Sequence, residues 1–254
     1  MSAIFKREFK AYFSSPIGYI FLAAIWFIGG FQFSAVFSYG VPAVPEVLNS
    51  LAWVFLLVIS VVVMRSFSEE RGKKIDQLLL TAPVKLSSIV FGKFFAAMSL
   101  YAISLAPTLI YQFIMMSKVK SAAFSSYLYM LFGMLLFGAI LISLGMFISS
   151  LTESPALAGV VTEAVNLMIL FMPNFGQTLQ DKLSGTAASA SSKFDLGKAL
   201  LKLLNNCVNG LNITDRLENF SKQVFSIADV IYMLGFTVIF LFLCFRMLEK
   251  KRWA

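Results

Sequence analysis

Six long apolar stretches alternate with short charged segments along the chain. A hydrocarbon core of ~30 Å needs about 20 helical residues at a rise of ~1.5 Å per residue. The stretches that meet this length are residues 16–37, 47–65, 91–116, 127–149, 155–172 and 229–246. The pattern predicts an all-α integral membrane protein with six transmembrane helices, built as a single transmembrane domain over residues 1–254. An even number of spans places both termini on one side of the membrane.

The composition supports this fold class and excludes several kinds of chemistry. Of the 254 residues, 59% are hydrophobic and 13% are charged, whereas about 25% charged residues is usual in a soluble domain. Histidine is absent, which excludes histidine-based triads, histidine zinc sites and haem ligation. The two cysteines, Cys207 and Cys244, suggest neither a disulfide framework nor a metal clip. We therefore expect no metal site.

The basic residues indicate which side of the membrane the termini occupy. Lys and Arg gather beside the cytoplasmic ends of spans. Lys118 and Lys120 are exceptions, because they would lie on the external side if the termini are cytoplasmic. In that orientation the basic residues of the cytoplasmic segments are Lys6, Arg7, Lys10, Arg65, Arg71, Lys73, Lys74, Lys85, Lys93, Arg246, Lys250, Lys251 and Arg252. We expect both termini to be cytoplasmic. The net charge of +8 then reflects topology and does not indicate nucleic-acid binding.

The N-terminal residues 1–14 predict an amphipathic helix that lies in the membrane interface. Phe5, Phe9 and Phe13 recur at helical spacing and are opposed by Lys6 and Lys10. Aromatic and basic side chains partition together at that boundary. An ordinary basic flank of the first span is the alternative. Because the apolar stretch that follows is long enough to span, we expect the first span to remain in the mature protein.

The cytoplasmic segment 66–83, between the second and third spans, predicts a short helix. Ile75, Leu78 and Leu79 form an apolar stripe at i, i+3 and i+4, the other face carries charge, and Pro83 limits how far the helix continues. A soluble partner with an apolar groove could grip such a helix. The alternative is that the helix lies on lipid.

The external segment 174–227 is the longest stretch outside the spans. It passes through a low-complexity piece, Ser184–Ser192, which we expect to be flexible, and then becomes helical. Leucines from Leu196 to Leu211 form a stripe that suggests a helix resting on the membrane surface or on a partner. Structural packing is the favoured role, and a gate or substrate receptor is the alternative.

One carboxylate, Glu163, lies halfway along the fifth span. A charge at that depth costs at least ~2.5 kcal/mol, so its side chain should face a partner or a cavity. Glu163 and Asn166 are therefore candidate pathway or intramembrane polar residues. The alternatives are that the span enters obliquely, or that Glu163 is protonated and bonded to a neighbour such as Thr162 or Asn166.

Several sequence blocks resemble a known family. Residues 64–71 read MRSFSEER and residues 78–83 read LLLTAP. Further blocks are residues 7–19, 149–153, 215–222 and 248–253, together with Asp229. These blocks resemble the permease subunits of type-2 ABC exporters. The likeness is greatest to the gliding-motility ABC permease family, which is related to the permease for nitrous-oxide-reductase maturation.

The resemblance implies a dimeric permease in the cytoplasmic (inner) membrane of a bacterium. It would move an unknown substrate across or within that membrane, using ATP hydrolysis by a separate cytoplasmic ATP-binding subunit. The second permease could be another copy, a different permease or an accessory subunit. The coupling helix would run from Glu69 to Pro83, with Glu69, Glu70, Arg71, Ile75, Leu78, Leu79, Leu80 and Pro83 as coupling residues. The chain departs from the family at Lys74-Ile75 and Gln77, where the family has Gly-Thr and Glu.

The chain carries no phosphate-binding loop of its own. Neither Gly92-Lys93 nor Gly197-Lys198 has the preceding Gly or the following Ser or Thr that cradles phosphates. We expect ATP and Mg to bind the partner and this chain to have no catalytic residues. A membrane scaffold for an ATPase-driven assembly is the first alternative. An ion-coupled carrier is the second, although it would need more intramembrane polar residues than the single carboxylate Glu163.

Overall fold

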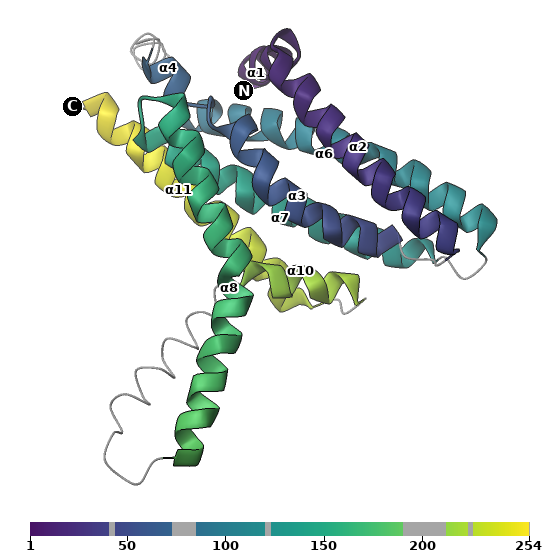
Figure 1. The fold of residues 1–254 in the computed structure, drawn as a ribbon. Coiled ribbons are helices and arrows are strands. Elements are labelled where there is room, and N and C mark those ends of the chain that lie inside the picture. The colour runs from purple at the N-terminus through teal and green to yellow at the C-terminus, as the bar shows by residue number, and fades with distance from the viewer. Residues whose placement is uncertain (41–43, 73–84, 120–122, 190–211, 223–225, 254) are drawn as a thin grey trace.

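The computed structural model describes residues 1–40, 44–72, 85–119, 123–189, 212–222 and 226–253, and within these ranges all regular structure is helical (Figure 1). The helices are α1 (Ser2–Ser14), α2 (Pro16–Tyr39), α3 (Val44–Val63), α4 (Ser68–Gly72), α6 (Leu86–Lys118), α7 (Phe124–Leu151), α8 (Pro155–Ser189), α10 (Ile213–Ser221) and α11 (Ile227–Trp253). The predicted all-α membrane fold is confirmed.

Six of the described helices are long and apolar enough to cross a membrane, as predicted. They cover Pro16–Tyr39, Val44–Gly72, Leu86–Lys118, Phe124–Leu151, Pro155–Met172 and Ile227–Lys250. Local sequence sets several of their ends. Pro16 begins α2, where the missing N–H costs nothing, and Gly40 ends α2 with a φ of 65°, which glycine adopts readily. The third span starts earlier than expected, at Leu86 instead of residue 91, so that Lys93 lies about two turns from the start of the helix.

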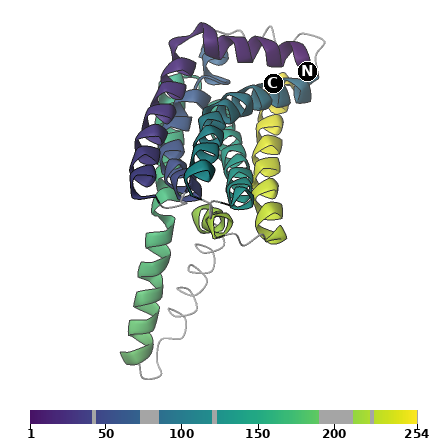
Figure 2. The same ribbon diagram turned by 90° about the vertical axis from the view of Figure 1, so that its right-hand side faces the viewer.

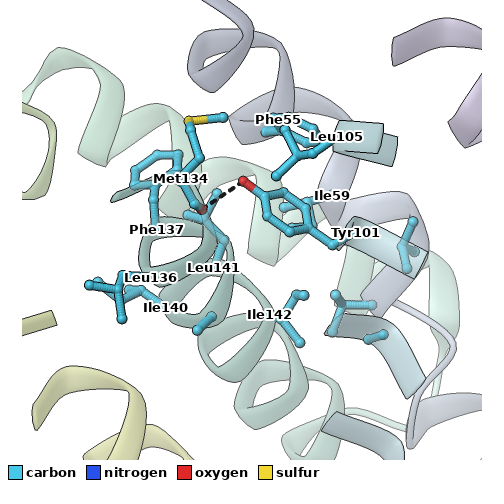
Figure 3. Packing of buried hydrophobic residues seen from close by; sticks show 14 of the residues in the cluster. Phe55, Ile59, Tyr101, Leu105, Met134, Leu136, Phe137, Ile140, Leu141 and Ile142 are labelled. Atoms are coloured by element: carbon cyan, nitrogen blue, oxygen red, sulfur yellow. Dashed lines mark hydrogen bonds between the residues drawn. The ribbon is translucent and has the colours of Figure 1, made fainter. Parts of the chain in front are cut away.

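Helix α7 forms the centre of the bundle. It packs against α3, α6, α8 and α11, and 78% of its spanning window is buried, against 17% for α8. Close packing depends on a glycine. Gly138 of α7 lies against the buried ring of Tyr101 on α6, and the Tyr101 hydroxyl donates a 2.9 Å hydrogen bond to the Met134 carbonyl (Figure 3). Small residues let membrane helices approach in this way.

The two ends of the bundle differ. Both termini lie at the same end as α1 and α4, whereas α10 and the distal half of α8 lie at the opposite end (Figures 1 and 2). Helix α1 runs across the ends of the spans and lies nearly at right angles to them (Figure 2). The end of the bundle that holds both termini is called the terminus-bearing end below, and the end that holds α10 is called the opposite end. This arrangement is the one that six spans require.

The external segment differs from its prediction. Helix α8 continues without a break from Pro155 to Ser189, so the stretch from Ser184 to Ser189 is helical and the expectation of a flexible piece there is wrong. After Pro173 the chain holds no further proline before Ser189, and residues such as Gln, Leu, Lys and Ala allow a helix to continue. The stripe from Leu196 to Leu211 lies outside the described residues.

Helix α10 is fixed to the beginning of α11 at the opposite end. Arg216 of α10 pairs with Asp229 at 2.7 Å, and Asn219 donates a 3.0 Å hydrogen bond to the same carboxylate. The Arg216 guanidinium also lies 3.8 Å above the Tyr232 ring. One turn after Arg216, Phe220 packs against Gly133 of α7. Helix α10 is therefore part of the folded bundle, whereas the role of the stripe from Leu196 to Leu211 stays a prediction.

Replacing Gly138 should destabilise the bundle. In Gly138→Ala the new methyl group would overlap the Tyr101 ring, which is fully buried and cannot swing away. We expect the free energy of unfolding to fall by about 1–3 kcal/mol, the usual cost of overpacking a core. SDS titration of the purified protein in detergent, followed by circular dichroism, measures it.

Gly235→Ala in α11 is the matched control, because nothing lies within 4 Å of the added methyl group. Its unfolding free energy should stay unchanged or rise by up to about 1 kcal/mol, since Ala favours helix over Gly. Equal effects of the two substitutions would contradict close packing of α6 on α7.

Candidate functional site

The end of α3 and the start of α4 are held against the end of α7. Ser149 of α7 accepts hydrogen bonds from the backbone N–H groups of Phe67 (3.0 Å) and Ser68 (3.1 Å), and its hydroxyl donates to the Met64 carbonyl at 3.1 Å. One serine side chain therefore ties down the turn through which the chain leaves the second span.

Arg71 fixes the end of α4 to the turn between α7 and α8. Its guanidinium donates to the carbonyls of Ser150 (2.9 Å) and Thr152 (3.1 Å) and pairs with Glu153 at 3.1 Å. A cation at this place satisfies carbonyls left free at the C-terminus of α7 and complements the helix dipole. The base of segment 66–83 is thus joined to the fourth and fifth spans.

Four charged side chains form a closed cycle between α1, α4 and α6, which we call the charge ring. Its members are Arg7, Glu8, Glu70 and Lys93. Arg7 contacts both carboxylates at 2.7 Å, and Lys93 contacts Glu8 at 3.2 Å and Glu70 at 3.1 Å. The hydrogen bond to Glu8 raises the pKa of Arg7, so the guanidinium stays charged. The ring balances two positive against two negative charges.

Lys93 is the buried member of the ring, with 2% of its side chain exposed. Besides the two carboxylates, its ammonium donates a 2.7 Å hydrogen bond to the Ser66 carbonyl and lies 5.2 Å from the centre of the Phe67 ring. A buried ammonium is tolerated only when its charge and its donors are matched. Lys93 has such partners from two other helices, α1 and α4, and from the turn before α4.

A cleft of about 380 Å³ lies between α1 and the α3–α4 turn. All four members of the charge ring line the cleft, and the other lining residues are Ala11, Tyr12, Ser15, Ile17, Val62, Arg65, Ser66 and Glu69. The cleft separates α1 from the turn between α3 and α4, and the charge ring bridges it.

Helix α1 packs across α6 next to the charge ring. Ile4 lies so close to Gly92 that a side chain there would not fit. Phe5 and Phe9 stack with ring centres 5.8 Å apart, and Phe9 and Phe13 follow at 5.1 Å. Lys6 and Lys10, which form the polar face opposite these rings, are exposed. The helix is amphipathic as expected, and its place in the membrane interface stays a prediction.

The predicted coupling residues fall into two groups. Glu70 and Arg71 make the contacts described above, and Glu69 lies 3.9 Å from Arg65, one turn earlier. The others, Ile75, Leu78, Leu79, Leu80 and Pro83, lie outside the described residues. Sequence reasoning missed the roles of Glu8, Lys93 and Ser149. Glu8 and Ser149 lie in blocks that carried the family resemblance, whereas Lys93 had been taken as a simple span flank.

The intramembrane polar residues join α8 to α3. The Ser60 hydroxyl donates a 2.7 Å hydrogen bond to Glu163, and the Asn166 amide donates a 2.8 Å hydrogen bond to the Leu56 carbonyl. Thr162 instead donates to the Ala158 carbonyl of its own helix, so the structure does not show the alternative in which Glu163 is bonded to Thr162 or Asn166. Glu163 and Asn166 are three residues apart, about one helical turn, which puts both on the side of α8 that meets α3.

Glu163 stands at the edge of that contact. It is half-buried, while Val160 and Leu167, one turn to either side, are exposed and apolar. Among the described residues no three side chains of the metal-binding types gather there or elsewhere. The carboxylate is the only formal charge of α8 between Pro155 and Met172.

Neutralising this carboxylate should stabilise the isolated chain. Glu163→Gln keeps an acceptor for Ser60 but removes a charge that costs at least ~2.5 kcal/mol in mid-membrane. We expect unfolding in detergent to require about 1–2 kcal/mol more, because micelle water already offsets part of that cost. SDS titration measures it, with Asn174→Ala at an exposed site of α8 as the control. A loss of stability would instead show that the hydrogen bond from Ser60 to the carboxylate contributes more than the burial of the charge costs.

The comparisons with known proteins agree with this arrangement. The sequence model of a family described as ABC-2 family transporter protein matches residues 22–253. Comparison with curated proteins gives no match. The matched range takes in most of the first span and all of the other five, together with the charge-ring residues Glu70 and Lys93, and Glu163. The chain therefore belongs to the ABC-2 family of transporter proteins and is a membrane permease subunit of an ABC transporter.

Proposed function

We propose that the chain is the permease subunit of an ATP-driven exporter, of the gliding-motility permease group. Separate cytoplasmic subunits bind and hydrolyse ATP, and segment 66–83 receives their movement. The family match supports the permease role, and the blocks at residues 64–71 and 78–83 support the narrower group. The chain's own residues bind and guide the substrate without covalent chemistry.

The observation that carries the proposal is the way the base of segment 66–83 is held. Ser149 and Arg71 join it to α7 and to the turn before α8, and Glu70 joins it to α6 and α1. A force applied to the segment is therefore passed to several spans at once. A loop that only connected two spans would not need contacts of this kind.

The proposed orientation places the terminus-bearing end in the cytoplasm. Both termini and α4 are at that end (Figure 1). Arg65 lies in the turn between α3 and α4, and Arg71 lies in α4. The basic residues follow the positive-inside rule in this orientation. In this proposal the protein lies in the inner membrane of a bacterium. The coupling segment is then on the cytoplasmic side, where ATP is present.

The proposed substrate path lies beside α3 and α8, where two permease subunits meet. Helix α8 presents a broad exposed apolar face in the single chain, and Glu163 borders it. A second copy or a related permease covering this face would enclose the carboxylate. Glu163 and Asn166 would then lie next to the path, with the carboxylate available to a substrate.

The first test is a charge in the predicted apolar stripe of the coupling segment. Leu79→Glu places a carboxylate in the contact with the ATP-binding subunit, where an unpaired buried charge is strongly unfavourable. We expect the purified permease in nanodiscs to lose most of its binding to that subunit, and the complex to lose its stimulated ATP hydrolysis. Pull-down and a phosphate-release assay measure the two effects.

Gln77→Glu is the matched control, because it adds the same charge on the polar face of the same predicted helix. It should bind and stimulate the ATP-binding subunit as the original chain does. If no ATP-binding subunit binds the original chain, or Leu79→Glu binds it unchanged, the coupling role of segment 66–83 is refuted.

A further inference from the structure

The charge ring joins α4 to α1 across the cleft, and it joins both of these helices to α6, on which α1 also packs directly. Glu70 belongs to α4, Lys93 to α6, and Arg7 and Glu8 to α1. The cleft between α1 and the α3–α4 turn leaves room for relative movement, so the connection across it depends on these side chains. A displacement of Glu70 therefore strains its ion pairs with both cations of the ring, Arg7 and Lys93.

The interfacial helix is in turn joined rigidly to the first span. Gly18 of α2 lies against the backbone of Tyr12, so closely that a side chain at position 18 would overlap the Tyr12 carbonyl. The peptide chain turns between α1 and α2 at Ser15, and Phe13 packs against Tyr19 with ring centres 5.7 Å apart. A shift of α1 is therefore passed to α2.

The same ring reaches the third span through Lys93. This ammonium is buried and contacts Glu8, Glu70 and the Ser66 carbonyl, so that it cannot leave one partner without disturbing the others. Charges with several fixed partners specify a geometry more narrowly than apolar contacts do, because each lost bond leaves a buried charge unmatched.

We propose that Lys93 is a positioning residue for energy coupling, and that the charge ring makes α1 a second route by which movement of the coupling segment enters the membrane. The inference rests on the proposed function. The first route runs through Arg71 and Ser149 to α7 and α8. The second runs through Glu70 to Lys93 and Glu8, and so to α6, α1 and the first span.

The test follows α1 in the assembled complex. Spin labels are attached at Lys6→Cys on α1 and Lys250→Cys on α11, both exposed positions, in a chain that carries Cys207→Ser and Cys244→Ala. The permease is reconstituted in nanodiscs with its ATP-binding subunit, and the label distance is measured with and without a non-hydrolysable ATP analogue. Binding of the subunit and ATP hydrolysis are measured on the same samples.

We expect the analogue to shift the label distance in the original chain. Glu8→Gln and Lys93→Met should abolish the shift while the ATP-binding subunit still binds, because neither residue lies in segment 66–83. Lys93→Arg keeps the cation and should retain the shift. Glu218→Gln, which breaks an exposed ion pair with Lys222 at the opposite end, is the matched control and should also retain it.

The outcomes separate this proposal from the function on which it rests. If the subunit binds and hydrolyses ATP but the shift is absent in the original chain, or survives in both Glu8→Gln and Lys93→Met, the second route is overturned and the permease function stands. If Lys93→Met fails to fold, Glu8→Gln decides, since an amide keeps the shape of the carboxylate. If no ATP-binding subunit binds the original chain, both proposals are refuted, and the binding assay alone shows it.

Discussion

Hydrocarbon offers no partner to a polar group, so each buried polar side chain of this chain must find one inside the protein. This constraint explains where the structure is most specific. Lys93 is surrounded by two carboxylates and a carbonyl, Arg71 satisfies the end of α7, and Asn166 binds a carbonyl of α3. Apolar packing fills the bundle, whereas these contacts decide which helix ends meet.

The constraint also divides the molecule into a fixed centre and a less committed edge. Helix α7 is covered on nearly all sides, while among the residues of α8 whose burial the structure describes, the fully buried ones lie in a stripe that holds Ala158, Thr162 and Asn166. The face of α8 beyond Glu163 is apolar and uncovered in the single chain. A transporter needs both properties, because movement at the edge requires a centre that does not follow it.

The sequence was sufficient to predict the spans but not their connections. Each span is a run of apolar residues that any account of the hydrocarbon core must recognise, and the count and order follow directly. Lys93 could not be understood in this way, because its partners Glu8 and Glu70 lie far away along the chain and are brought together only by folding. The same holds for Ser60 of α3, whose hydroxyl donates a hydrogen bond to Glu163 of α8, 103 residues further along the chain. The sequence does not predict the extension of α8 through Ser189, because the composition of residues 184–189 favours a loop. In the structure the helix of the fifth span simply continues through these residues.

The unbroken length of α8 has a geometric consequence. Its 35 residues correspond to a rod of roughly 50 Å at ~1.5 Å per residue, well beyond the ~30 Å of hydrocarbon. The excess stands clear of the bundle at the opposite end (Figure 1). If such a rod pivots near its base, a tilt of about 10° moves its tip by roughly 9 Å, a lever that turns small rearrangements between spans into large displacements outside the membrane.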